Sequence, residues 1–294
     1  MLSNKAKASL RTPKHEGDKK MLELMILPFL ICLILTGIYT YFGLHVVQRG
    51  VIFVDIALAQ MIALGGACAL LLGIELNQPQ VYLFAVGFAL LGAVIFTLTR
   101  IKQAQAPQEA VIGIVYVVST AAAILVLNRV PEGAEHIKEM LVGGILFATP
   151  KDVLLIFILS LVVGVFHLLY RRRFLLVSLS SDSACKGGIS IRLWDFLFYL
   201  TFGLIVTVSV RIVGVLLIFS YLIIPAVVAM LLAKGVGKRL IIGWIIGILA
   251  SIIGLYASCV FDFPTGASIV CSFGLILIMV TGGRWMFCKE TGSK

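Results

Sequence analysis

The feature that most constrains the fold is a series of long apolar stretches separated by short polar connections. Each stretch has about 18 residues or more, enough for a helix to cross a hydrocarbon core about 30 Å thick. The stretches cover about 21–44, 51–73, 80–99, 109–128, 152–170, 193–210, 213–233, 239–260 and 266–287. Only a helix satisfies its own backbone in lipid without a closed barrel. The sequence therefore predicts an all-α polytopic membrane helix bundle with about eight or nine transmembrane helices.

Composition excludes an ordinary soluble domain. Hydrophobic residues make up 61% of the chain and charged residues 13%, whereas soluble domains have about half and a quarter. We expect a basic N-terminal tail over 1–20, disordered, followed by a single transmembrane domain over 21–294. The net charge of +10 sits in short runs between apolar stretches, so we expect no nucleic-acid surface. No CxxC pair occurs, and the cysteines are interpreted as small apolar residues.

The distribution of Lys and Arg predicts the orientation of the spans. Connections rich in these residues belong on the cytoplasmic side; they lie at 100–102, 171–192 and 234–239. The turns at 75–79 and 261–265 contain neither residue and fit the outer side. Consecutive spans end on alternate sides of the membrane. All five connections then lie on their predicted sides only if the segment 193–233 crosses the membrane twice. Nine spans then place the C-terminus inside and the N-terminus outside despite its basic tail, and one hypothesis is that translation starts at Met21.

The segment from Val208 to Lys234 carries Arg211, Gly214 and Pro225 in an otherwise apolar run. An arginine at a helix centre costs roughly 2.5–3.5 kcal/mol on insertion scales, and a mid-helix proline removes a hydrogen bond. Neighbouring protein or a wet cavity makes such breaks tolerable. We predict two short helices that meet near Arg211, the second bent at Pro225, with Arg211 near outer headgroups or a wet cavity. The alternative is a proline kink without a transport role.

Three stretches resemble the permease subunits of ABC transporters for divalent metal ions, the zinc, manganese and iron group. The sequence GVLLIFSYLIIPAVVAMLLA at 214–233 is similar to that family's glycine, aliphatic run and Leu-Ile-x-Pro-Ala. The sequence DSACKGGISIRLWDFLF at 182–198 resembles its cytoplasmic loop, and DFPTGASIVC at 262–271 resembles the Pro-Thr-Gly-Ala start of its last helix. The match runs in register from about Met21 to Phe287.

The resemblance implies a permease of the bacterial inner (plasma) membrane that imports manganese, iron or zinc. It implies three protein partners: a separate ATP-binding cassette ATPase, an external metal-binding protein and a second permease copy in a homodimer. The sequence agrees, because GVGKRL at 235–240 lacks the glycine spacing of a phosphate-binding loop. We therefore expect a transport subunit that is not an enzyme itself and needs no cofactor.

The loop from Ser178 to Ile191 is the predicted contact for the ATPase. A residue at 180–182 can cap a short helix, and glycines at its end can adopt the left-handed conformation without strain. Such a helix on the basic side has the shape of a coupling helix, and the alternative is an ordinary capped loop. The predicted coupling residues are Asp182, Ala184, Gly187 and Gly188.

Asp55 and Gln60 are the predicted substrate-path residues, with Asp55 as a metal ligand. In that family the second span carries a sequence similar to Gly-Asp-Ala-Leu-Ser-His, with a glycine five residues later. Here Gln60 stands where the histidine belongs, and Asp55 lies one residue earlier than the family's aspartate. Imidazole suits zinc and an amide oxygen is a harder ligand, so manganese or iron is favoured. Five residues apart, the two share a helix face only if the helix is distorted.

Both residues also have structural alternatives. Asp55 can pair with a base such as Arg49 and never meet the substrate, and Gln60 can hold two helices together by a hydrogen bond. Glu109 opens the fourth span, where the helix dipole alone accounts for an acid. His45 and His167, near span ends, are interpreted as interfacial.

The outer loop at 131–140 supplies candidates for the outer mouth, namely Glu132, Glu135 and His136. They can attract or relay cations, form a solvated amphipathic helix or contact an external binding protein.

Two other functions compete with the ABC hypothesis. A secondary, gradient-driven transporter usually places paired acids and half-helices at the midplane, and Asp55 is the only buried acid that we predict. An intramembrane protease needs HExxH or paired aspartates in its spans, which this sequence lacks.

Overall fold

The computed structural model describes residues 14–75, 78–100, 107–130, 143–179 and 187–291, which contain helices and no strand. The elements are α1 (Lys14–Arg49), α2 (Val54–Leu71), α3 (Pro79–Leu98), α4 (Gln108–Leu127), the 3-10 turn η1 (Ile145–Phe147), α6 (Pro150–Leu169), α7 (Arg171–Leu179), α9 (Ile191–Val213), α10 (Val215–Leu232), α11 (Val236–Phe261) and α12 (Thr265–Thr291). Within these residues nine helices are long and apolar enough to cross a membrane. The predicted all-α membrane bundle is confirmed. The basic segment is helical from Lys14, and residues 1–13 lie outside the described part.

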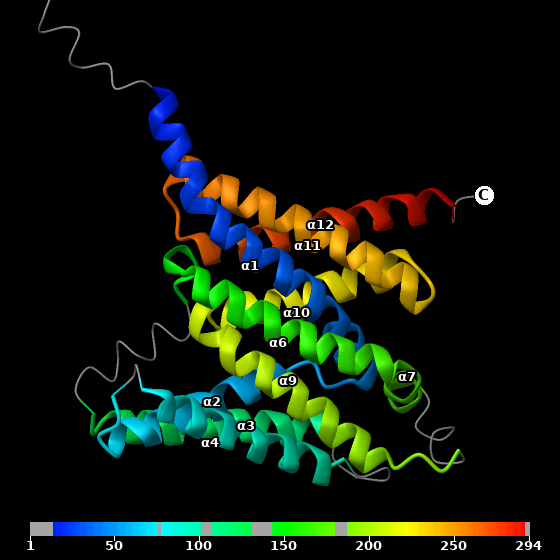
Figure 1. The fold of residues 1–294 in the computed structure, drawn as a ribbon. Coiled ribbons are helices and arrows are strands. Elements are labelled where there is room, and N and C mark those ends of the chain that lie inside the picture. The colour runs from blue at the N-terminus through cyan, green and yellow to red at the C-terminus, as the bar shows by residue number, and fades with distance from the viewer. Residues whose placement is uncertain (1–13, 76–77, 101–106, 131–142, 180–186, 292–294) are drawn as a thin grey trace, which may run out of the picture.

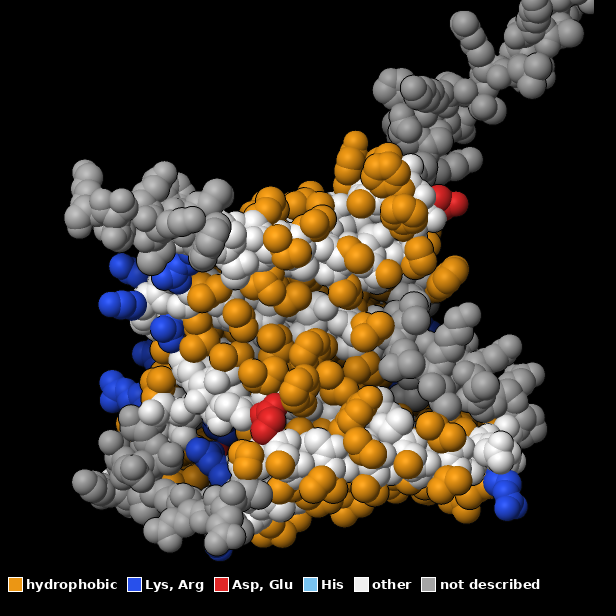
Figure 2. All heavy atoms as spheres, turned by 180° about the vertical axis from the view of Figure 1, so that it is seen from behind, with side chains coloured by type: hydrophobic (Ala, Val, Ile, Leu, Met, Phe, Trp, Pro, Cys, Tyr) orange, Lys and Arg blue, Asp and Glu red, His pale blue; other side chains and the backbone are white. Residues whose placement is uncertain are grey.

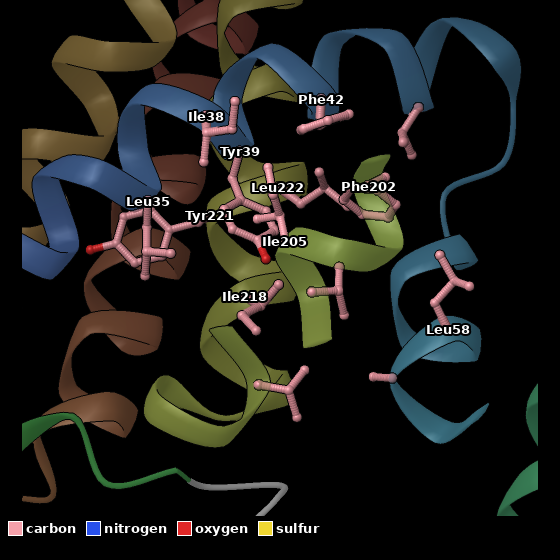
Figure 3. Packing of buried hydrophobic residues seen from close by; sticks show 14 of the residues in the cluster. Leu35, Ile38, Tyr39, Phe42, Leu58, Phe202, Ile205, Ile218, Tyr221 and Leu222 are labelled. Atoms are coloured by element: carbon pink, nitrogen blue, oxygen red, sulfur yellow. The ribbon is translucent and has the colours of Figure 1, made fainter. Parts of the chain in front are cut away.

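The helices form two packed groups that α9 and α6 connect (Figure 1). In one group α2 packs against α3 and α4, and in the other α1, α10, α11 and α12 pack together. Helix α9 lies against α3 and also contacts α2, α6 and α10. Figure 3 shows side chains of α1, α9 and α10 meeting in the core, among them Tyr39, Phe202 and Leu222. These three side chains are fully buried.

Glycines allow the closest helix contacts in the second group. A Cβ on Gly43 of α1 would collide with the backbone carbonyl of Leu222 on α10, and one on Gly247 of α11 would lie 2.6 Å from Thr36. Because lipid tails are as apolar as the helix surfaces, the hydrophobic effect does not drive helices together in a membrane. Small residues that permit close van der Waals packing hold them together.

We expect Gly43→Val to separate α1 from α10 and to destabilise the protein by about 1–3 kcal/mol, as overpacking does. The matched control is Gly37→Val on the same helix, where a Cβ would have no neighbour within 4 Å. Thermal unfolding in detergent, followed by size-exclusion chromatography, measures both variants. Equal unfolding temperatures for the two would contradict this close packing.

The segment at 191–233 forms two helices, as the charge distribution predicts, but their lengths and junction differ from the prediction. They have 23 and 18 residues, so neither is short, and they meet at Gly214 with φ +82°. The segment that begins at Gly143 packs against this break and bonds a carbonyl at the end of α9. Gly144 N–H donates to Ile212 C=O at 3.1 Å, and Gly143 lies directly against the Val213–Gly214 backbone. Pro225 lies inside α10, which continues past it.

The two ends of the bundle differ in charge. In Figure 1 the C-terminal ends of α1, α3 and α12, the whole of α7 and the α10–α11 turn lie at one end. Figure 2, seen from behind, shows most of the visible Lys and Arg gathered at that same end. By the positive-inside rule we expect this basic end to face the cytoplasm. The end of α2, the α9–α10 junction and the α11–α12 turn lie at the opposite end (Figure 1), in agreement with the predicted alternation.

Candidate functional site

Asp55 lies in the first turn of α2 and is 1% exposed. One carboxylate oxygen, Oδ1, accepts the Ile56 N–H at 2.7 Å. The other, Oδ2, is buried and has no hydrogen-bond partner among the described atoms. The helix N-terminus favours an acid here, yet burying a charged group that is not fully paired is costly. Asp55 is therefore an interior acid with one oxygen available to a cation, a proton or water.

The structure does not bring Gln60 beside Asp55. Helix α2 is continuous from Val54 to Leu71, so the distortion that a shared face requires is absent, and five residues turn the direction by about 140°. Gln60 is half-buried and follows one turn after Ile56. With Gly113 and Tyr116 of α4, Ile56 lines an apolar recess of about 340 Å³. The two predicted path residues thus lie on different sides of α2.

Arg49 does not pair with Asp55, so that structural alternative is wrong. Its Nη1 donates to Asp195 Oδ1 at 2.8 Å, and both side chains are 1% exposed. Its guanidinium also lies 3.9 Å over the Phe198 ring. Asp195, in the first turns of α9, is a second buried acid that the sequence analysis missed. The sequence signal for this residue is an acid inside an apolar run, with arginines in the nearby basic connections.

Asp195 is the centre of a cluster that joins four elements. Arg100, just beyond α3, donates through Nη1 to the same Asp195 Oδ1 and through Nη2 to Val177 C=O on α7 at 3.3 Å. Ser178 Oγ accepts from Arg49 Nε at 2.8 Å and hydrogen-bonds His45 Nδ1 at 2.8 Å. We call Arg49, Arg100, Asp195 and Ser178 the arginine–aspartate cluster. It fixes α7 and α9 to α1 and to the end of α3.

The interpretation of the two histidines as interfacial is wrong, because each is 1% exposed. His167 Nε2 hydrogen-bonds Thr201 Oγ1 at 2.8 Å, and its Nδ1 lies 3.2 Å from Tyr41 Oη. Its ring also stacks on Phe174 at 4.0 Å between centroids. Both imidazoles are satisfied packing groups between α1, α6, α7 and α9.

Glu109 has a partner that the helix-dipole interpretation did not predict. Its two carboxylate oxygens accept the backbone N–H groups of Ile52 and Phe53, each at 3.1 Å. These donors lie immediately before α2, so the acid that opens α4 also holds the start of the helix that carries Asp55.

The predicted coupling loop is described only in part. Asp182 and Ala184 lie outside the described residues. Gly187 and Gly188 form a turn, and Gly188 has φ +71°, the left-handed conformation expected of a glycine at a helix end. Ser190 caps α9 by accepting the Leu193 N–H at 3.5 Å. The loop therefore emerges next to the arginine–aspartate cluster.

The outer end contains a recess of about 400 Å³, lined by Tyr82, Gly143, Gly144, Phe147, Ala148, Asp152, Arg211 and Ile212. Arg211 lies 4.1 Å over the Tyr82 ring and is exposed, as the prediction of a headgroup or cavity position requires. The outer-mouth candidates Glu132, Glu135 and His136 lie outside the described residues. In the part of the chain that the structure describes, no three His, Cys, Asp or Glu residues gather as a metal site.

Comparison with known proteins decides the family. The profile of the ABC 3 transport family matches residues 21–282, which include eight of the nine candidate spans and all but the last two residues of the ninth. The chain belongs to the ABC 3 transport family. A relative from Listeria monocytogenes, the manganese transport system membrane protein MntC, is 24% identical over 250 residues, covering 85% of each chain. The manganese import system permease protein ScaB of Streptococcus gordonii is 26% identical over 241 residues, covering 81% of this chain and 83% of ScaB.

A solved structure supports the same fold. The structure of PsaBC from Streptococcus pneumoniae in complex with Fab superposes with a TM-score of 0.73 at 21% identity, covering 87% of this chain and 90% of that one. This ABC 3 member is thus a multi-pass protein of the bacterial cell membrane and the permease type of ABC subunit. The resemblance inferred from the three sequence stretches is confirmed.

Proposed function

We propose that this ABC 3 permease imports a divalent metal ion, with manganese favoured, using ATP hydrolysis on a separate ATPase subunit. The observation that carries the proposal is the family match over residues 21–282. Two relatives, MntC and ScaB, are named as manganese transport proteins, which favours manganese among the possible metals. An external metal-binding protein supplies the ion at the outer end.

Asp55 is the proposed path residue for the ion. Its free Oδ2 supports this role, because a hard divalent cation prefers carboxylate oxygen. No described Lys or Arg forms a salt bridge with it. A conformational change must open the interior of the bundle to bring an ion there.

A second copy of the chain is the proposed cover for the Gln60 side of α2. The recess beside Ile56 is apolar and open, and an amide facing lipid alone would lack a partner. In a homodimer with the path between the copies, Gln60 would face that path or the other protomer.

Reconstitution tests the proposed function directly. The chain is placed in proteoliposomes with its ATPase and external binding protein, and uptake of manganese, iron(II) and zinc is measured by mass spectrometry with and without ATP. ATP-dependent manganese uptake is expected. The alternative is a secondary transporter, because Asp195 is a second buried acid. Asp195 is, however, paired with two arginines. Uptake driven by an ion gradient without ATP would favour that alternative.

We expect Gln60→His to raise the ratio of zinc to manganese uptake several-fold, because imidazole is a better ligand for zinc than an amide oxygen is. Competition between the two metals in the same vesicles measures this ratio. An unchanged ratio with normal total uptake would mean that Gln60 acts as a helix-packing residue and does not touch the ion.

A further inference from the structure

The pairing in the arginine–aspartate cluster is incomplete. Both Arg49 Nη1 and Arg100 Nη1 donate to one oxygen of Asp195, Oδ1. The other oxygen, Oδ2, is buried without a partner among the described atoms, and so is Arg49 Nη2. An arginine and a carboxylate commonly pair through two parallel hydrogen bonds. Here Arg49 Nη2 and Asp195 Oδ2 are left without a partner, while Arg100 shares Asp195 Oδ1 with Arg49.

The two arginines are held very differently. Arg49 is 1% exposed, is bound by Ser178 and lies over the Phe198 ring. The side chain of Arg100 is 20% exposed and follows the last residues of α3, outside the helix. Arg100 is therefore the member that can leave the cluster, and Arg49 is the fixed one.

Departure of Arg100 would leave a complete pair behind. Arg49 Nη2 and Asp195 Oδ2 could then meet and form the forked pair, which satisfies both unused groups. The cluster would change from two positive charges on one negative charge to a neutral pair. It would thus have two discrete arrangements, the shared one seen here and a forked one, as a switching element requires.

Arg100 also links the cluster to the proposed path residue. Its bonds tie the end of α3 to α7 and α9. Helix α3 is tightly packed on α2: a Cβ on Gly92 would lie 2.8 Å from Leu58, and one on Gly65 would lie 2.7 Å from the Phe84 carbonyl. Because Asp55 lies on α2, a shift of α3 would be passed to the helix that carries Asp55.

We propose that Arg100 is a positioning residue that couples the ATPase partner to the bundle. In the shared arrangement it holds α3 to α7 and α9. In the forked arrangement it turns to the ATPase side, and α3 moves with α2. This inference rests on the proposed function, because it assumes an ATPase at the basic end.

Arg100→Gln tests the proposal in vesicles that contain the permease and its ATPase. ATP hydrolysis and manganese uptake are measured together, and their ratio is the readout. Arg100→Gln is expected to fold and to bind the ATPase, but to transport about tenfold less metal per ATP, within the range of coupling between sites. Arg100→Lys keeps the charge and should recover at least half of the ratio. The control is Lys238→Gln, exposed in the first turn of α11 at the same basic end, with an unchanged ratio expected.

Three results would overturn the proposal. The first is an unchanged ratio in Arg100→Gln. The second is loss of thermal stability as large as that of Asp195→Asn, which would make Arg100 purely structural. The third is loss of ATPase co-purification, which would make Arg100 a docking residue. Failure of the proposed function looks different, because the unmodified chain would then show no ATP-dependent uptake.

Discussion

Asp55→Asn is expected to reduce metal uptake by about tenfold or more while the protein stays folded. Loss of a residue that merely orients a ligand already costs about 10–100-fold, and here the carboxylate itself is removed. Asparagine has nearly the same shape and can still accept the Ile56 N–H, so α2 should remain intact. ATP-dependent manganese uptake in proteoliposomes is the measurement, with size-exclusion chromatography as the test of folding.

The matched control is Asp262→Asn. Asp262 is exposed in the outer turn with φ +55°, a conformation that asparagine also tolerates, so uptake should not change. If Asp55→Asn transports normally, the carboxylate is structural and the ion takes another route.

Asp195→Asn should be the most destabilising of the substitutions considered. It leaves the buried Arg49 guanidinium without a counter-charge and next to Arg100, and breaking a buried pair by removing one partner costs about 3–5 kcal/mol. We expect little folded protein after detergent extraction. The fraction that elutes as a single species after heating at graded temperatures measures the loss.

A double variant separates lost pairing from lost shape. In Asp195→Asn with Arg49→Met the buried positive charge is gone, and Arg100, which is partly exposed, can turn to solvent. Replacing a buried pair by uncharged groups is often close to neutral, so the double variant should be more stable than Asp195→Asn alone. A double variant that is less stable would show that Arg49 contributes mainly through its packing on Phe198.

The spans and their sides were predictable because the signals are local or cumulative. A run of about 20 apolar residues and a bias of Lys and Arg need no knowledge of contacts between helices. The double crossing of 193–233 followed from the same bias. The position of the break at Gly214 depends on φ and on a loop some 70 residues earlier, so the sequence placed it only approximately, near Arg211.

The contents of the candidate site were less predictable, because they depend on distant partners. The sequence indicates that Asp55 is a buried acid. It does not show that Arg49 pairs instead with Asp195, 146 residues further on in the chain. The burial of His167 depends on Tyr41 in the same way, across 126 residues. Pairwise contacts of this kind leave no periodic trace in one sequence.

The hydrogen bond from Gly144 to the end of α9 has a practical consequence for work on this transporter. A reporter, epitope or fluorophore inserted at 143–148 would pull on the α9–α10 junction and change the molecule that it is meant to observe. The exposed turn at 261–263 does not carry such a contact to that junction. Tags for sidedness assays or single-molecule measurements on the outer surface therefore belong in that turn.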